Sequence, residues 1–552
     1  MTRWDHEADV VIVGAGGAAL AAAAAAVEAG ASVVMLEAGD EPGGTTKLSG
    51  GAFWIPNNTL MRAAGLSDPR DAALRLMARL SYPSIYDPEA PRLGLTENEH
   101  ALLAAFYDHG SAVIDELIRL GAIDPMILPP LGFGPSPIAD PDYHAELPEN
   151  AAPEGRVLTA KTPPGVMAWP GVYLAGGMIE HVRGRGVPIH VRHRVVRALV
   201  NGRGDVIGVE AEHDGQTRAV HARRGVVFAT GGFAHDAAKV RAHLRGPIFG
   251  SGSASTANGA FLDIAARLGA SFGNLQNGFF YQAALEEMLA TGGAVRNPFA
   301  HAFLPYGDST IFVNKYGRRF VDEKAMYHVR AQSHFHWAGT EFPNLVQIMI
   351  WDEWVANEPT FWPWRGVVPL PGMESSFVIR ADTIPELAQR IDERLASLRG
   401  RQSLNGAIGK DVRLAPDFLP NLQATIQRFN GFAETGVDLD FHRGETPLSP
   451  AWQGPSRNGP NRTMYPLAPT GPYYALLLGA ATLDTCGGPR IDPAGRVLRD
   501  DGTPIPGLYG AGNAIASPAG HGYWGAGGTI GPALVFGFLA GQHAAREAHR
   551  PA

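Results

Sequence analysis

The chain has 552 residues, of which 45% are hydrophobic, so it can bury large cores in roughly two to four folding units. Its 46 Lys and Arg residues against 54 Asp and Glu residues give a net charge of −8, which removes the usual electrostatic basis for binding nucleic acid. The single cysteine, Cys486, excludes an intrachain disulfide and a multi-cysteine zinc or iron–sulfur site, and it is typical of a cytoplasmic protein.

The first uncharged run, residues 10–27, is long enough to be mistaken for a membrane or signal segment. However, acidic residues precede it, and the β-branched residues 10–13 are followed directly by a glycine-rich turn. This pattern predicts a strand at 10–13, a turn at 14–16, a helix at 17–29 and a second strand at 32–36. We therefore expect no transmembrane segment.

The predicted strand–turn–helix–strand unit carries the residues of a dinucleotide site. Gly14 permits the tight turn, Gly16 lets a diphosphate approach the backbone at the helix N-terminus, and Ala19 is small enough for the helix to pack on the sheet. Glu37 ends the second strand and can accept hydrogen bonds from an adenosine ribose. Its negative charge would repel a 2′-phosphate, so the pattern disfavours NADP.

Further glycine turns occur far apart in the chain, within residues 43–51, 225–233 and 507–513, and a small-residue helix is predicted at about 530–549. No second strand, glycine triplet, helix and acid unit appears. This arrangement resembles the flavoprotein subunits of the fumarate reductase and succinate dehydrogenase superfamily, in which FAD lies across glycine turns from distant segments. The resemblance implies FAD without a dedicated NAD(P)H domain, and noncovalent FAD because residues 41–51 contain no histidine.

The residues expected to bind FAD follow from these turns. They are Gly14, Gly16, Gly17, Ala18, Glu37, Ala38, Gly43, Gly44, Thr45, Thr46, Ser49, Gly50, Gly51, Val195, Ala229, Thr230, Gly231, Gly512, Asn513, Gly528, Thr529 and Ile530.

The same patterns divide the chain into two kinds of domain. Residues 124–175 are proline-rich and irregular, as in a loop that covers a site, and a different, aromatic-rich texture begins near residue 300. We expect an α/β fold, with a Rossmann-like FAD-binding domain built from residues 1–299 and 471–552. An inserted α+β catalytic or capping domain would occupy residues 300–470.

The last glycine-rich block distinguishes the branches of the superfamily. No Asn-Arg pair follows His521 and Gly522, so the dicarboxylate clamp of the fumarate reductases is missing. Residues 512–532 instead resemble the 3-ketosteroid Δ1-dehydrogenases, whose signature combines Gly-Asn, a Tyr-x-Gly-x-Gly turn and Thr-Ile-Gly-Pro.

That resemblance implies four catalytic positions. Tyr523 and Gly527 match the hydroxyl and the backbone amide that bind the substrate carbonyl, where two donors stabilise an oxygen that gains enolate charge. Tyr327 matches the tyrosine that removes the α proton, and Tyr143 matches a second tyrosine that donates to its oxygen and eases its ionisation. With flavin N5 accepting a hydride from the β carbon, the implied reaction is α,β-desaturation of a cyclic ketone, above all Δ1-dehydrogenation of a 3-ketosteroid.

Two departures from the family pattern leave the substrate open. Trp524 replaces a small residue or proline, and Asp322 replaces the commoner Asn. A smaller alicyclic ketone of the cyclohexanone type becomes the alternative if the pocket is narrowed by Trp524 and by the tryptophans at 351, 354, 362 and 364. A fumarate-reductase-like C=C reductase and a flavin-binding protein without turnover are the remaining alternatives.

The expected partners are small molecules. The substrate would be a cyclic ketone, and the electrons would pass to an acceptor that the sequence does not identify, such as a quinone, a dye or oxygen. Cys486 is not expected to act as a catalytic thiol. No metal site is expected either, because the 19 histidines include no helical pair with an acid.

Overall fold

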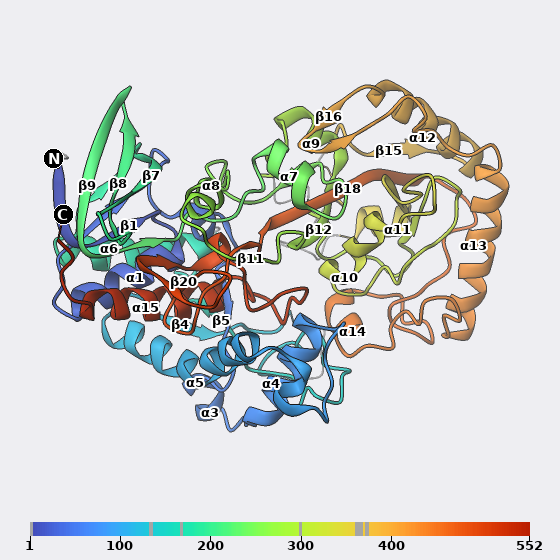
Figure 1. The fold of residues 1–552 in the computed structure, drawn as a ribbon. Coiled ribbons are helices and arrows are strands. Elements are labelled where there is room, and N and C mark those ends of the chain that lie inside the picture. Colours follow the sequence, from blue (N-terminus) through green and yellow to red (C-terminus); the bar gives the residue numbers. More distant parts are fainter. Residues whose placement is uncertain are drawn as a thin grey trace.

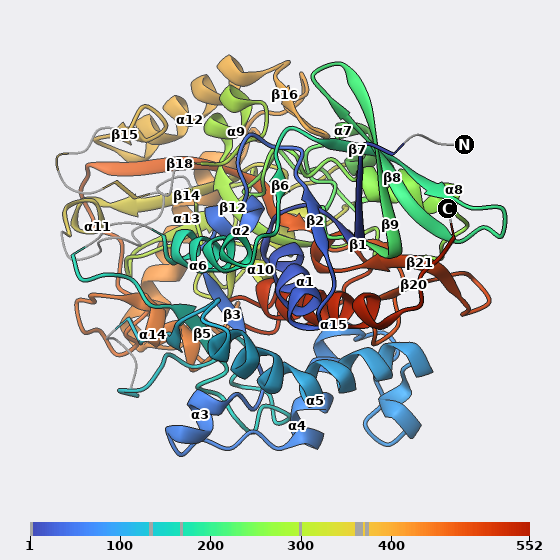
Figure 2. The same ribbon diagram turned by 90° about the vertical axis from the view of Figure 1, so that its left-hand side faces the viewer.

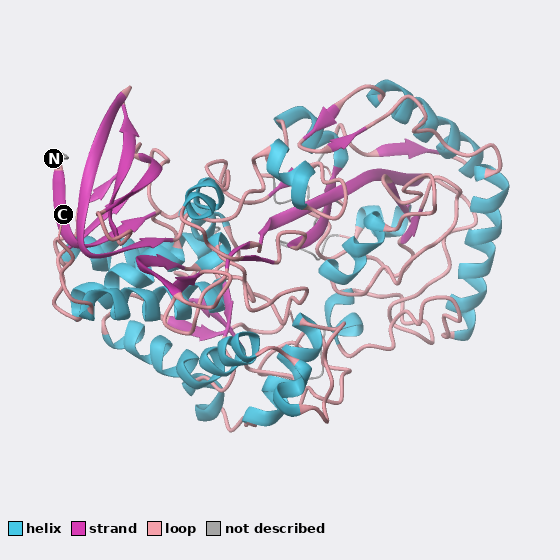
Figure 3. Ribbon diagram, viewed as in Figure 1, coloured by secondary structure: helices cyan, strands magenta, loops and turns pink. Residues whose placement is uncertain are grey.

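The computed structural model describes residues 4–131, 136–165, 169–296, 301–358, 368–369, 372 and 375–551. These residues form two lobes, each built on its own sheet (Figure 1). Both chain ends lie at the lobe that contains the first sheet. Long helices border the outer edge of the other lobe, as the colouring by secondary structure shows (Figure 3).

The first sheet has a parallel centre assembled from three distant parts of the chain. Strand β1 (His6–Val13) pairs in parallel with β2 (Val33–Leu36) on one side and with β9 (Gln216–Phe228) on the other. Strand β21 (Pro504–Gly510) pairs in parallel with β9. The apolar residues of β1 and β2 are buried, as is typical of central parallel strands covered on both faces. The predicted Rossmann-like strands are therefore confirmed.

Helix α1 (Gly17–Glu28) packs against α15 (Ile530–Arg546), and the two lie side by side in Figure 2. A Cβ at Gly537 would lie 2.3 Å from the Ala18 carbonyl oxygen, and one at Gly541 would lie 2.1 Å from that of Ala22. Only glycine allows this close approach, which explains why the predicted N-terminal and C-terminal helices are both rich in small residues. The described part of the chain contains no helix with the length and hydrophobicity needed to cross a membrane.

The second sheet is organised around β18 (Tyr473–Thr485), which pairs with β12 (Gly278–Ala284) and β14 (Gln347–Asp352). Strands β10 (Gly250–Ser251) and β15 (Ile379–Ala381) also pair with β18, and β13 (Ile311–Val313) pairs with β14. Because β10 and β12 precede the predicted inserted segment and β18 follows it, this sheet runs across both predicted domain boundaries. The division at residues 300 and 470 stays a prediction.

The predicted irregular segment holds little regular structure. Its strands β4 (Pro125–Ile127) and β5 (Val157–Ala160) form a small antiparallel sheet with β3 (Ala52–Trp54), followed by helix α6 (Pro170–Gly184). The remaining described elements are α2 (Gly44–Leu48), α3 (Thr59–Ala63), α4 (Arg70–Ser81), η1 (Pro91–Gly94), α5 (Glu97–Arg119), β6 (Ile189–His190), β7 (Arg194–Val200), β8 (Val206–His213), α7 (Ala237–His243), α8 (Ala260–Arg267), β11 (Phe272–Gly273), α9 (Leu285–Thr291), α10 (Tyr327–Ala331), η3 (Gln332–Phe335), α11 (Glu353–Asn357), α12 (Ile384–Leu398), β16 (Gln402–Ser403), β17 (Gly406–Ala407), α13 (Phe418–Thr435), α14 (Leu448–Gln453), β19 (Gly488–Pro489), β20 (Arg496–Leu498) and η4 (Gly512–Ala514).

Candidate active site

A cavity of about 940 Å³ is lined both by predicted FAD-binding residues and by predicted catalytic residues. All the expected FAD-binding residues line it except Gly43 and Gly528, and so do Tyr143, Tyr327, Tyr523 and Gly527. The two exceptions lie just behind the wall. The Gly43 amide donates to the Ala15 carbonyl oxygen at 2.8 Å, and the Gly528 amide donates to that of Gly525 at 2.9 Å.

The glycine turns at one end of the cavity have the shape that a dinucleotide needs. Gly14 has a φ of +105°, and a Cβ there would lie 2.4 Å from the Ala229 carbonyl oxygen, so only glycine fits. By contrast, a Cβ at Gly16 or Gly50 would meet no protein atom closer than 4.0 Å. These two glycines therefore leave open space beside the backbone, as a diphosphate at the turn after β1 requires. The residues present fit FAD.

Glu37 joins the two loops of the first βαβ unit. Its Oε2 accepts a hydrogen bond from the Ala15 amide at 2.9 Å, and its Oε1 accepts one from the Gly39 amide at 2.7 Å. Burial raises the pKa of Glu37, and the backbone amides oppose that rise. A carboxylate has further lone pairs beyond these two bonds, so a ribose hydroxyl can still donate to it.

One acid at this end of the cavity is absent from the sequence-based set. Asp484, near the end of β18, lines the cavity and is fully buried. It accepts hydrogen bonds from the Gly232 amide at 2.9 Å and from the Asn513 side chain at 3.2 Å, so it ties two predicted FAD turns together. Burial raises its pKa to about 6. The sequence feature that could have pointed to Asp484 is its position directly before Thr485, where the strand ends in a glycine turn.

The other end of the cavity is a cluster of three buried tyrosines. The ring centroids of Tyr143, Tyr327 and Tyr523 are 5.6 Å apart in each of the three pairs, and the rings meet edge to face. The Tyr143 and Tyr327 hydroxyl oxygens are 2.9 Å apart. Three segments that are far apart in the sequence thus supply one polar cluster inside an aromatic wall.

A fully buried ionic network holds Tyr143. The Tyr143 amide donates to Asp142 at 3.1 Å, and Asp142 also accepts from the Trp54 indole at 2.8 Å and from Arg156 at 3.2 Å. Arg156 pairs in turn with Asp68 at 2.8 Å. Breaking such a buried pair is strongly destabilising because it leaves a charge uncompensated, so the network fixes the backbone on which Tyr143 stands.

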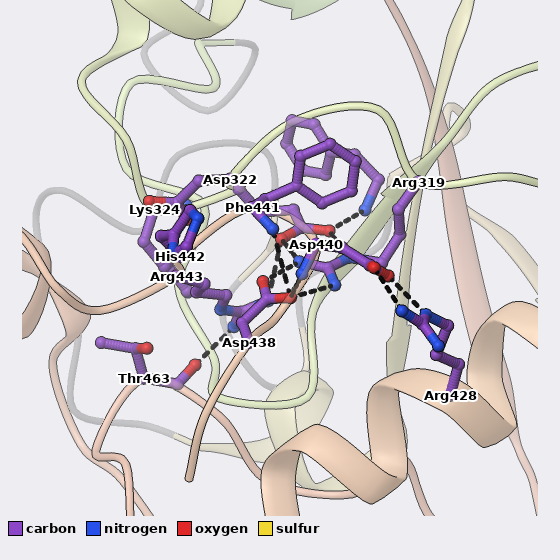
Figure 4. Close-up of polar contacts among 12 residues, drawn as sticks. Arg319, Asp322, Lys324, Arg428, Asp438, Asp440, Phe441, His442, Arg443 and Thr463 are labelled. Carbon is purple, nitrogen blue, oxygen red and sulfur yellow. Dashed lines mark hydrogen bonds and ion pairs between the residues drawn. The ribbon is translucent and has the colours of Figure 1, made fainter.

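A second buried network precedes Tyr327 (Figure 4). Arg319 pairs with Glu323 at 2.7 Å and with Asp438 at 2.8 Å, and Arg443 pairs with Glu323 at 3.2 Å. These bonds anchor the turn that leads into α10, whose first residue is Tyr327. The family resemblance singled out Asp322 and Tyr327 in this segment, but only the fold brings Asp438 and Arg443 to it.

Tyr523 and Gly527 meet in the C-terminal turn. Gly527 has a φ of +81°, and a Cβ there would lie 2.3 Å from the Ala52 carbonyl group, so no other residue fits. Burial raises the pKa of Tyr523, and hydrogen bonding with Tyr327, the Gly527 amide and Thr529 opposes that rise. The Gly527 amide therefore lies beside the Tyr523 hydroxyl, and their joint role at a substrate carbonyl stays a prediction.

Tyr327 is buried, and burial raises its pKa well above 10. The expected contact with Tyr143 is present, and either hydroxyl can be the donor. The prediction that Tyr143 eases the ionisation of Tyr327 stays a prediction.

The two departures from the family pattern lie outside the cavity wall. The Trp524 indole is buried, stacks on Phe106 and donates to the Ser81 hydroxyl at 2.9 Å. Asp322 accepts from the Lys324 amide at 2.8 Å, and burial raises its pKa to about 6. Neither residue lines the cavity.

The tryptophans named as a condition for a narrower pocket do not narrow it where the structure describes them. Trp351 and Trp354 do not line the cavity, and residues 362 and 364 lie outside the described residues. Trp169 and Trp452, which the sequence reading did not single out, line it instead.

Cys486 does not line the cavity. It is buried, its Sγ contacts the Gly520 carbonyl oxygen at 3.6 Å, and burial raises its pKa to about 12. A protonated thiol is a poor nucleophile. Among the residues that the structure describes, no group of three or more His, Cys, Asp or Glu side chains is arranged to hold a metal ion.

Known proteins resemble the chain over nearly its full length. The model of the FAD binding domain family matches residues 9–530. The 3-oxosteroid 1-dehydrogenase of Mycobacterium tuberculosis is 29% identical, with 98% of this chain and 99% of that protein covered. The 4-oxocyclohexanecarboxylate 2-dehydrogenase of Sinomonas cyclohexanicum is 30% identical, with 98% of this chain and 93% of that protein covered.

A solved structure confirms the predicted fold. The 3-ketosteroid delta1-dehydrogenase from Sterolibacterium denitrificans, in complex with 1,4-androstadiene-3,17-dione, gives a TM-score of 0.78 at 23% identity and covers 98% of this chain and 99% of that chain. The family model spans both the glycine turns and the tyrosine cluster. The chain therefore belongs to the FAD binding domain family, and it is an FAD-dependent oxidoreductase of that family.

Proposed function

We propose that this flavoenzyme introduces a C=C bond α,β to the carbonyl of a cyclic ketone, and that the ketone is a 3-ketosteroid desaturated between C1 and C2. The observation that carries the proposal is the cluster of Tyr143, Tyr327, Tyr523 and Gly527 in the cavity that the FAD turns also line. The names of the M. tuberculosis relative and of the S. denitrificans structure support the steroid.

The carbonyl end of the reaction falls to Tyr523 and Gly527. A hydroxyl and a backbone amide that converge on one oxygen bind an enolate better than a ketone, because the negative charge grows on that oxygen during proton removal. Both donors are held by the fold before substrate binds. The Gly527 backbone is fixed by its contact with Ala52, and the Tyr523 ring packs on Phe279 with centroids 5.2 Å apart.

The α proton passes to the Tyr327 oxygen. Because Tyr327 is protonated at neutral pH, its own proton has to leave first, and Tyr143 is the hydroxyl within hydrogen-bond distance at 2.9 Å. Tyr143 takes that proton as it releases its own to water. The chemistry that bound FAD supplies is acceptance of the hydride from the β carbon, which completes the double bond.

The wall around the tyrosines favours a large apolar substrate. The cavity beyond the cluster is lined by Leu128, Pro129, Phe303, Leu304 and Trp452. Such side chains bind a multi-ring hydrocarbon body through burial of apolar surface.

A smaller ring ketone is the second candidate. The relative from S. cyclohexanicum is 30% identical, and its name gives a single-ring oxo acid as substrate. A C=C reductase is disfavoured, because it needs a cationic proton donor. Arg296 lines the cavity, but it donates to the carbonyl oxygens of Gly252 and Ser253 at 3.2 and 2.7 Å.

Anaerobic flavin reduction tests the proposal. FAD-loaded protein is mixed with 4-androstene-3,17-dione, with cyclohexanone or with succinate, and the flavin absorbance is followed. We expect the steroid to bleach the flavin fastest and NMR of the product to show a new C1–C2 double bond. Faster bleaching by cyclohexanone would select the smaller ketone, and bleaching by succinate alone would refute ketone chemistry.

A further inference from the structure

Asp140 places a carboxyl group in the cavity wall beside the tyrosine cluster. Asp140 and Trp452 both line the cavity, and the carboxyl interacts with the Trp452 indole. The Trp452 ring lies edge-on to Tyr143, with centroids 5.3 Å apart, and the Tyr143 hydroxyl is 2.9 Å from that of Tyr327. The carboxyl is thus two aromatic rings away from the proposed base.

Within the part of the chain that the structure describes, no cation pairs with this carboxyl. Its Oδ2 accepts a hydrogen bond from the Leu131 amide at 3.1 Å, and no ion pair among the described residues involves it. Arg156, which shares a smaller adjoining pocket with Asp140, is committed to Asp68 and Asp142. Burial raises the pKa of Asp140, and so does Glu154, a second carboxylate.

The described cations that line the cavity either have other partners or lie at the FAD end, where Arg194 acts on the Glu37 carboxylate. Lys47 pairs with Glu41 at 2.8 Å. Arg296 donates to the Ser253 carbonyl oxygen. The following amide, that of Ala254, donates to the Thr45 hydroxyl at 3.0 Å, so Arg296 holds a segment that contacts a predicted FAD turn. The described wall at the tyrosine end therefore combines phenols and apolar side chains with His301, whose pKa burial lowers to about 4, and with the carboxyl group of Asp140.

We propose that Asp140 makes this site selective for ring ketones that carry no carboxylate, so that the substrate is a neutral ketone. The inference rests on the proposed ketone dehydrogenation and narrows its substrate class. Any ring whose carbonyl oxygen lies at Tyr523 and Gly527 shares the cavity with Asp140. In a wall of low polarity, the negative charge of Asp140 weakens binding of an anion in the same cavity on the order of tenfold.

The test compares 4-oxocyclohexanecarboxylate with its methyl ester, which keeps the ring and removes the charge. Binding to the FAD-loaded protein is measured at pH 8 from the change in flavin absorbance, and anaerobic flavin reduction is measured in parallel. We expect the ester to bind at least about tenfold more tightly than the acid. Asp140→Asn should improve binding of the acid by about that factor and leave the ester unchanged.

Glu154→Gln is the matched control, because it removes a nearby negative charge that does not line the main cavity. It should change the ratio of the two affinities by less than about threefold. Asp140→Ser, with FAD retention as a check on folding, guards against a defect peculiar to Asn.

The outcomes separate the two proposals. The role of Asp140 would be overturned if the ratio of the ester affinity to the acid affinity were the same in the wild type and in both Asp140 variants. A preference of the wild type for the acid would overturn it too, and so would failure of both compounds to bind. If ketones bind but never bleach the flavin, the proposed dehydrogenation fails, while the binding ratio still decides the role of Asp140.

Discussion

The two ends of the cavity are built in opposite ways. At the FAD end, the lining comes largely from consecutive residues of short loops, as in residues 14–18. The polar groups there include backbone amides and the carboxylates of Glu37 and Asp484. At the other end, single side chains come from segments as far apart as Tyr143 and Tyr327, 184 residues along the chain. The first end fits the shape of a common cofactor, whereas the second carries the side chains of the proposed reaction.

The means of fixing each end differ accordingly. The glycine turns are held by backbone hydrogen bonds and by close contacts that only glycine allows. Buried ion pairs hold the segments that carry Tyr143 and Tyr327. Arg156 forms such a pair in the network around Tyr143, and Arg319 forms one in the turn before Tyr327. Changes at the FAD end should therefore alter cofactor retention, and changes at the tyrosine end should alter chemistry without loss of cofactor.

The largest expected effect belongs to Tyr327→Phe. Loss of the proton acceptor should slow flavin reduction by ketone about 10³- to 10⁴-fold, while FAD content and the flavin spectrum stay normal. Stopped-flow absorbance under anaerobic conditions measures the rate. Tyr281→Phe is the control, since this buried tyrosine does not line the cavity. Rapid bleaching in the Tyr327 variant would remove the base from our mechanism.

Tyr523→Phe sharpens the comparison within the tyrosine end. One of two donors to the growing negative charge is lost, so the limiting rate of flavin reduction should fall about 10²- to 10³-fold. Half-saturation should change far less, because the neutral ketone gains little from each donor. The Gly527 amide remains and should leave measurable activity. An unchanged limiting rate with weaker binding would mean that Tyr523 only packs against the substrate.

Glu37→Ala probes the FAD end. It removes two hydrogen bonds from backbone amides to a buried carboxylate, at 2.9 and 2.7 Å, together with any bond to the ribose. Loss of bonds of this kind should increase the FAD dissociation constant about 10- to 100-fold. Glu41→Ala is the matched control in the same loop, because Glu41 makes an exposed pair with Lys47. Full FAD occupancy of the Glu37 variant after dialysis would contradict the assignment.

A pH dependence is the smallest effect when it is counted per pH unit, at about tenfold. Burial holds the pKa of Tyr327 well above 10, and the reactive form is the deprotonated one. The rate of flavin reduction should therefore rise about tenfold per pH unit from pH 6 to pH 10, without a plateau. A plateau below pH 9 in the stopped-flow series would show that cofactor and substrate lower this pKa, and the two ends of the cavity would then be electrostatically coupled.

Local sequence was sufficient for the FAD end. Strand β1, the turn at Gly14, helix α1 and Glu37 are contiguous, and each position is restricted by backbone geometry that a short motif can express. The C-terminal signature likewise located Tyr523 and Gly527, because a glycine with positive φ and its neighbours form one turn.

The tertiary structure decided what depends on distance. The burial of Tyr327, the position of Trp524 outside the wall and the presence of Asp484 and Asp140 in the wall all follow from which segments pack together. The sequence of one segment does not encode how deeply other segments bury its side chains. Burial is the largest cause of the pKa shifts of Tyr327 and Asp140. The sequence alone determined which cofactor and which chemical groups are present, and the packing of distant segments determined their protonation and the shape of the space between them.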